Sequence, residues 1–116
     1  MDNKTKELFL NSLNDYIKGE EYLKETIDGV DKFTLMGVFC DIFKNKLKAN
    51  WIENPLLENR KTYYLLGGLK EISKILLKKL KVKSEVYEII KNCQKKYKSE
   101  PDFKKEIVFL DKNIIT

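Results

Sequence analysis

The strongest constraint on the fold is the helical spacing of apolar residues in the C-terminal half of the chain. In residues 69–81, apolar side chains recur every three or four positions, while lysines occupy the opposite side. This spacing predicts an amphipathic helix. A second helix of the same kind is predicted to begin at Ser84, a residue type that often caps helix N-termini. The two predicted helices favour a chain built mainly from helices.

The N-terminal half also follows a helical spacing. Apolar residues between positions 5 and 27 predict one helix, kinked or split at Gly19, and Asp28-Gly29 then marks a turn. Residues 32–50 are predicted to form the next helix. The alternation within "FTLMGVF" also fits a short strand there, and this alternative stays open.

The middle of the chain contains a helix start signal. Asn54 fits an N-cap and Pro55 fits the first helical position, so a third helix is predicted to run through "RKTYYLL". Gly67-Gly68 is expected to kink or break it. Residues 103–115 fit either a short helix or a strand, because they combine β-branched and aromatic side chains with charges.

A chain of 116 residues is long enough for one core and too short for two. We therefore expect residues 1–116 to form a single helical domain. The expected fold class is all-α, a compact bundle of about five helices with a possible short C-terminal strand.

The sequence lacks the residues that several kinds of catalytic, metal-binding and phosphate-binding site require. The sequence contains no histidine, which removes the commonest general base and the commonest transition-metal ligand. Cys40 and Cys93 fall at apolar helical positions, which indicates two buried thiols rather than a zinc site. No glycine pattern typical of phosphate binding occurs.

Three carboxylates, Glu21, Glu25 and Asp28, have the spacing of one helical face. They fit a metal or acid–base site, but nearby lysines favour a solvated surface. We therefore expect a protein that is not an enzyme, with no catalytic residue, no metal and no cofactor.

Positive charge is concentrated in the C-terminal part of the chain. The net charge is +5, and residues 70–116 carry 13 basic and 7 acidic side chains. This asymmetry suits a polyanion, an acidic protein surface or an anionic membrane. The lysines that would form the basic surface lie on the outward sides of the two predicted helices: Lys70, Lys74, Lys78, Lys81, Lys91, Lys95 and Lys98.

Residues 69–98 resemble a helix–turn–helix in outline, with "NPLLENRKTYYLL" as a preceding helix. The resemblance implies a nucleic-acid-binding protein. However, Lys81 takes the turn position where glycine is usual, and Glu85 and Glu88 open the second helix, where phosphates would repel them. We therefore retain nucleic-acid binding as the alternative and favour ordinary solvated helix faces.

The preferred hypothesis is a small protein that binds a larger protein partner, such as an inhibitor, immunity protein, adaptor or assembly subunit. Size and composition are typical of a small bacterial or phage regulator. Aromatic residues are enriched among interface anchors. The candidate protein-binding residues are Trp51, Ile52, Tyr63 and Tyr64, although Trp51 would equally well cap the core.

The chain lacks an apolar run of about 18 residues, the length that a membrane-spanning helix requires. Its first residues also lack the apolar segment of a signal peptide. We therefore expect no transmembrane segment and a cytoplasmic protein.

Overall fold

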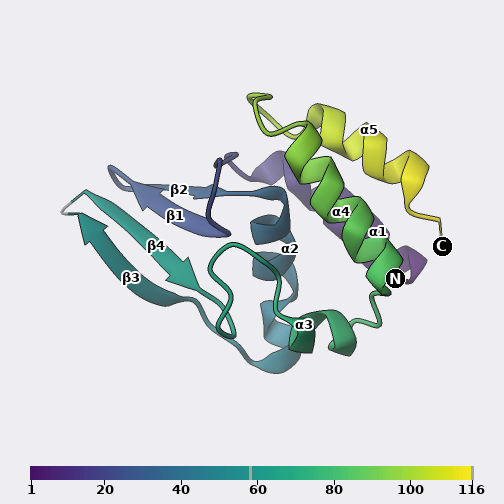
Figure 1. The fold of residues 1–116 in the computed structure, drawn as a ribbon, viewed down its shortest axis with the longest axis horizontal. Coiled ribbons are helices and arrows are strands. Elements are labelled where there is room, and N and C mark those ends of the chain that lie inside the picture. The colour runs from purple at the N-terminus through teal and green to yellow at the C-terminus, as the bar shows by residue number, and fades with distance from the viewer. Residues whose placement is uncertain (58, 116) are drawn as a thin grey trace.

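The fold combines helices with a four-stranded antiparallel sheet, in a computed structural model that describes residues 1–57 and 59–115 (Figure 1). The strands follow the order β2-β1-β4-β3. The helices are α1 (Asn3–Ser12), α2 (Leu35–Phe43), α3 (Lys74–Lys79), α4 (Ser84–Lys96) and α5 (Lys104–Asn113). The strands are β1 (Lys24–Ile27), β2 (Val30–Phe33), β3 (Ile52–Leu57) and β4 (Arg60–Tyr64). The prediction of an all-α bundle was therefore wrong.

The sheet and the helices occupy opposite ends of the molecule's long axis, with α2 between them (Figure 1). The turn between β1 and β2 points away from the helices (Figure 1). Of the four strands, β2 has the largest contact with a helix, and that helix is α2. As a result, most of the sheet projects from the helical body.

The first hairpin replaces the second half of the predicted N-terminal helix. The helix ends at Ser12, and β1 pairs with β2 across a two-residue turn in which both Asp28 and Gly29 have positive φ. Turns of this kind match the twist of the flanking strands. The turn prediction is thus confirmed, whereas the helix predicted over residues 5–27 is wrong beyond its first part.

The second hairpin replaces the helix predicted from Asn54. Asn54 lies opposite Thr62 in the sheet, and Pro55 lies opposite Lys61. Proline is found in outer strands such as β3, because one edge of such a strand has no partner strand. Side-chain preference also favours a strand in β4, which is rich in aromatic and β-branched residues.

The remaining helices follow the prediction more closely. α2 lies within the range predicted to be helical, and α4 begins at Ser84, with Lys83 rather than Ser84 as its N-cap. α3 is much shorter than the predicted helix over 69–81, since Ser73 caps it and the preceding residues form a loop. The C-terminal segment is the helix α5, so the strand alternative for residues 103–115 is wrong.

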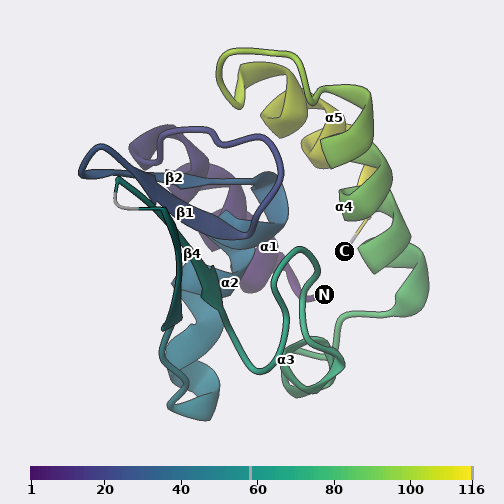
Figure 2. The ribbon, with the colours of Figure 1, turned by 60° about the vertical axis from the view of Figure 1, so that its left-hand side comes forward.

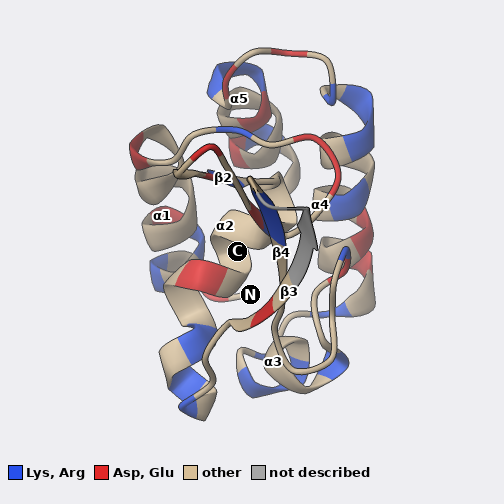
Figure 3. Ribbon diagram, turned by 90° about the vertical axis from the view of Figure 1, so that its left-hand side faces the viewer, with Lys and Arg blue, Asp and Glu red and all other residues tan. Residues whose placement is uncertain are grey.

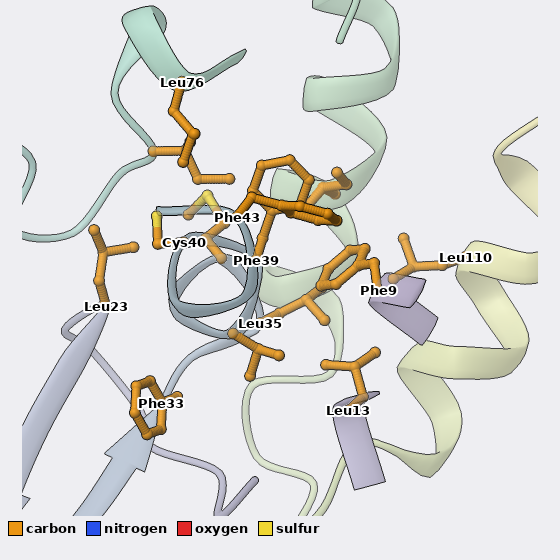
Figure 4. Packing of buried hydrophobic residues seen from close by; sticks show 14 of the residues in the cluster. Phe9, Leu13, Leu23, Phe33, Leu35, Phe39, Cys40, Phe43, Leu76 and Leu110 are labelled. Carbon is orange, nitrogen blue, oxygen red and sulfur yellow. The ribbon is translucent and has the colours of Figure 1, made fainter. Parts of the chain in front are cut away.

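The core surrounds α2 (Figure 4). Phe39 of α2 meets Phe9 of α1 edge to face, with ring centroids 5.3 Å apart. Leu110 of α5 and Leu76 of α3 are also fully buried against this cluster. α2 is therefore the element around which the other helices pack.

Both cysteines are free and buried, as predicted. Within residues 1–57 and 59–115, no helix has the length and apolar character that crossing a bilayer requires.

Candidate binding surface

Three aromatic side chains surround a lysine on one face of the sheet. Lys24 of β1 lies opposite Phe33 of β2. Glu25 lies opposite Thr62, so the next position along β4, Tyr63, falls beside Lys24 on its other side. Trp51, directly before β3, completes the group. We call Lys24, Phe33, Trp51 and Tyr63 the aromatic cluster.

The Lys24 ammonium lies against all three rings. Its Nζ is 4.4 Å from the ring centroid of Tyr63, 5.8 Å from that of Phe33 and 5.9 Å from that of Trp51. Each distance falls within the range of cation–π attraction. Lys24 makes neither an ion pair nor a hydrogen bond among the described residues. Within the described structure, the charged ammonium of Lys24 is therefore stabilised by the three rings.

Asp41 of α2 fixes one side of the cluster. Its Oδ1 accepts a hydrogen bond from Trp51 Nε1 at 2.8 Å and from Lys44 Nζ at 3.0 Å, and its Oδ2 accepts one from the Tyr16 hydroxyl at 2.6 Å. Burial opposes the charged carboxylate, but the three donors together outweigh burial and lower the pKa of Asp41. Burial, followed by the hydrogen bond to Asp41, raises the pKa of Tyr16.

A chain of hydroxyl groups fixes the other side. Thr26 Oγ1 donates to the Asp31 carboxylate at 2.6 Å and lies 2.9 Å from the Tyr63 hydroxyl. Because the one hydroxyl proton of Thr26 is used on Asp31, Tyr63 is the donor in the second bond. Both Trp51 and Tyr63 are therefore held in place by polar partners that are themselves ordered.

The structure separates the four predicted protein-binding residues into two pairs. Trp51 and Tyr63 lie on the same face, with ring centroids 6.5 Å apart. Since side chains alternate along a strand, Ile52 and Tyr64 lie on the opposite face. Ile52 is 64% exposed.

Sequence reasoning did not identify Lys24, Phe33, Asp41 or Tyr16 as parts of this site. Lys24 and Phe33 were assigned to helices, and they meet only through the pairing of β1 with β2. The available signal was the Asp28-Gly29 turn, because this dipeptide between short alternating segments is typical of a hairpin.

The opposite face of the sheet is partly covered by the chain itself. Glu25 is buried there and forms an ion pair with Arg60 at 3.0 Å. The Arg60 guanidinium lies 5.7 Å from the ring of Tyr22, in the segment between α1 and β1. This segment loops from the sheet toward α4 (Figure 2). The aromatic cluster is therefore on the more open face.

The three carboxylates predicted to share a helix face do not share a helix. Glu21 pairs with Lys70 at 2.7 Å, Glu25 pairs with Arg60, and Asp28 accepts a hydrogen bond from Asn59 at 3.0 Å. Within the described part of the chain, no three histidine, cysteine or acidic side chains gather closely enough to hold a metal ion.

The predicted lysine surface is exposed and lies on α3, α4 and the segments that flank them, where Figure 3 shows much of the positive charge. Lys70 pairs with Glu21, and Lys91 pairs with Glu71 at 3.1 Å. The other predicted lysines have no ion pair among the described residues: Lys74, Lys78, Lys81, Lys95 and Lys98.

The helix–turn–helix outline is present only in part. Lys81 has φ 56°, so it adopts the left-handed conformation that the turn of this motif requires. However, α3 has six residues, and the predicted preceding helix is instead the β3–β4 hairpin. Glu85 and Glu88 are both exposed at the start of α4. The three-helix unit inferred from the sequence is therefore wrong.

No family model matches the sequence, and neither a curated protein nor a solved structure shows significant similarity to it.

Proposed function

We propose that this chain is a non-enzymatic binding domain that contacts a protein partner through the aromatic cluster. The observation that carries the proposal is that Trp51 and Tyr63 are fixed on a projecting sheet face. Side chains already ordered before association lose little conformational entropy on binding. Tryptophan and tyrosine are also the residue types most enriched among energetically dominant contacts.

Polar and backbone groups around the cluster support the same proposal. Glu53 and Lys61 form an ion pair at 3.0 Å on this face, and both side chains are partly exposed. β3 is an outer strand of the sheet. A central aromatic patch with a polar rim beside a strand edge has the anatomy of a protein–protein interface.

A photo-crosslinking amino acid placed at Tyr63 in the native host tests this proposal, with the same substitution at Tyr64 as the control. The two positions are adjacent in sequence but face opposite sides of the sheet. We expect a discrete protein adduct from position 63 and none from position 64. Tyr63→Ala should then weaken binding of the purified partner, while Tyr64→Ala should not. Equal crosslinking from both positions would contradict the proposal.

Nucleic-acid binding is the second candidate, supported by the exposed lysines of α3 and α4 that have no acidic partner among the described residues. Phosphate contact requires only positive charge at suitable spacing, and such binding weakens steeply with salt. Fluorescence anisotropy of duplex DNA and single-stranded RNA at two salt concentrations tests it. The variant K74E/K78E/K95E should lose binding, whereas K4E/K46E/K48E, with the same net charge, should retain it. Equal loss in both would indicate a nonspecific charge effect.

A further inference from the structure

The aromatic cluster has the form of a cage with a cation inside it. The Phe33 and Trp51 rings are inclined by 60°, and the Trp51 and Tyr63 rings by 70°. Inclined rings form walls around a central point rather than a stack. The Lys24 ammonium occupies that point, within 6 Å of each ring centroid.

The cage gives Lys24 no hydrogen-bond acceptor among the described residues. A primary ammonium carries three N–H donors, and those that face the rings lose water without gaining a partner. A quaternary ammonium has no N–H group and therefore has no such donor to satisfy. Aromatic cages in general bind quaternary ammonium ions by cation–π attraction. The chemistry of this cage therefore suits a quaternary ammonium better than it suits its own lysine.

We propose that the cage formed by Phe33, Trp51 and Tyr63 is a binding site for a trimethylammonium group, and that Lys24 is an internal plug that competes for it. This inference rests on the proposed function, because the cage is the aromatic cluster through which a partner is proposed to bind. Two sources carry the same cation: a trimethylated lysine of a protein partner and a choline headgroup.

The cage walls are in place before any ligand arrives. Trp51 is held by Asp41, Tyr63 is held by Thr26, and the Phe33 ring packs edge to face on Tyr16 with centroids 4.9 Å apart. Binding a cation then requires only that Lys24 move outward, which its flexible side chain on the partly open face allows. The cost of organising the site is small for this reason.

Titration of K24A with tetramethylammonium chloride, at constant ionic strength, tests the site directly. The indole N–H resonance of Trp51 is the reporter, since the chain has one tryptophan. We expect saturable binding that is about tenfold tighter than in the unmodified protein, because removing Lys24 frees the rings from a competing cation whose own attraction to them is of this order. K4A is the matched control: it removes an exposed lysine of α1 and leaves the plug in place, so it should behave like the unmodified protein.

Two further comparisons separate a cation cage from a merely apolar hollow. K24A/Y63F keeps the ring and should bind tetramethylammonium, whereas K24A/Y63L should not. Choline should bind K24A, whereas 3,3-dimethyl-1-butanol, its neutral analogue of the same shape, should not. The proposal is overturned if folded K24A shows no saturable shift, or if the neutral analogue binds as well as choline.

The source of the cation is identified with K24A and two pairs of probes. A peptide with trimethyllysine is compared with the unmethylated peptide, and phosphatidylcholine vesicles with phosphatidylglycerol vesicles. Preference for the methylated peptide assigns the cage to a protein partner, and preference for phosphatidylcholine assigns it to a lipid. If tetramethylammonium binds while Tyr63 crosslinks to no protein, the cage stands and the proposed function fails. If Tyr63 crosslinks to a protein while tetramethylammonium does not bind, the proposed function stands and the cage proposal fails.

Discussion

Lys18 and Glu106 form a buried ion pair that ties the segment before β1 to α5. The Lys18 Nζ lies 2.9 Å from Glu106 Oε2, and the side chains are 6% and 0% exposed. Lys18 also donates to the backbone carbonyl of Tyr97 at 2.6 Å. Burial raises the pKa of the Glu106 carboxyl, and the neighbouring Lys18 opposes that rise. The pair thus joins three parts of the chain that are distant in sequence.

Removing one partner of this pair should destabilise the fold strongly. Lys18→Met leaves a buried carboxylate without its counter-charge, which typically costs about 3–5 kcal/mol. Urea denaturation measures the change in the free energy of unfolding. The double variant K18M/E106L replaces both charges by apolar groups and should recover much of the loss. If K18M is as stable as the unmodified protein, the pair does not hold the segment.

Gly37 should tolerate no side chain, because α2 approaches the backbone before β1 very closely. A Cβ at this position would lie 1.6 Å from the carbonyl oxygen of Leu23. We expect Gly37→Ala to lower the free energy of unfolding by about 3 kcal/mol or more, because backbone must move to relieve the overlap. Gly67→Ala is the control, since Gly67 has open space around it and φ of 83°. Its cost should be about 1 kcal/mol, from conformation alone. Equal effects of the two substitutions would show that the close approach is not tight.

The sequence predicted helices well where one face is buried in the core. α4 carries buried Ile90 and Cys93 at helical spacing, while Lys91 and Lys95 are exposed on the same helix. The sheet has no comparable pattern, because most of it does not pack on the core. Its strands carry Lys24, Glu25 and Lys61 among their apolar residues, so the usual alternation of apolar and polar positions is weak.

The candidate site was only half predictable for the same reason. Trp51 and Tyr63 were predicted to be contact residues from their types alone, and the structure leaves both partly exposed. Lys24 and Phe33 become part of the site through strand pairing, and Asp41 joins it through the packing of α2 against the sheet. Contacts of this kind depend on tertiary structure and leave no local pattern in the sequence.

The hydrogen bonds to Asp41 should make stability depend on pH in the acid range. The pKa of this carboxyl is lowered in the folded state, so its contribution is present above its usual pKa of 3.8 and is lost as pH falls through the lower folded value. We expect Asp41→Asn to be less stable than the unmodified protein near neutral pH by about 1–3 kcal/mol, from weaker hydrogen bonds. The difference between the two proteins should shrink as the pH falls below 3.8. Urea denaturation at several pH values measures it, and a constant difference would contradict the role assigned to the charge.

Both thiols should be unreactive in the folded protein. Burial is the main reason why the pKa of the Cys40 thiol is raised. Burial also raises the pKa of the Cys93 thiol, to about 12. The thiolate is the reactive form, so almost none is present near neutral pH, and access is also blocked. A chromogenic disulfide reagent should therefore detect no thiol in native buffer and both thiols in urea. Because reaction requires opening of the core, K18M should accelerate labelling of Cys93, whose Sγ lies 3.9 Å from the Glu106 carbonyl oxygen. Rapid labelling of Cys93 in the unmodified protein would instead mean that α4 and α5 separate readily in solution.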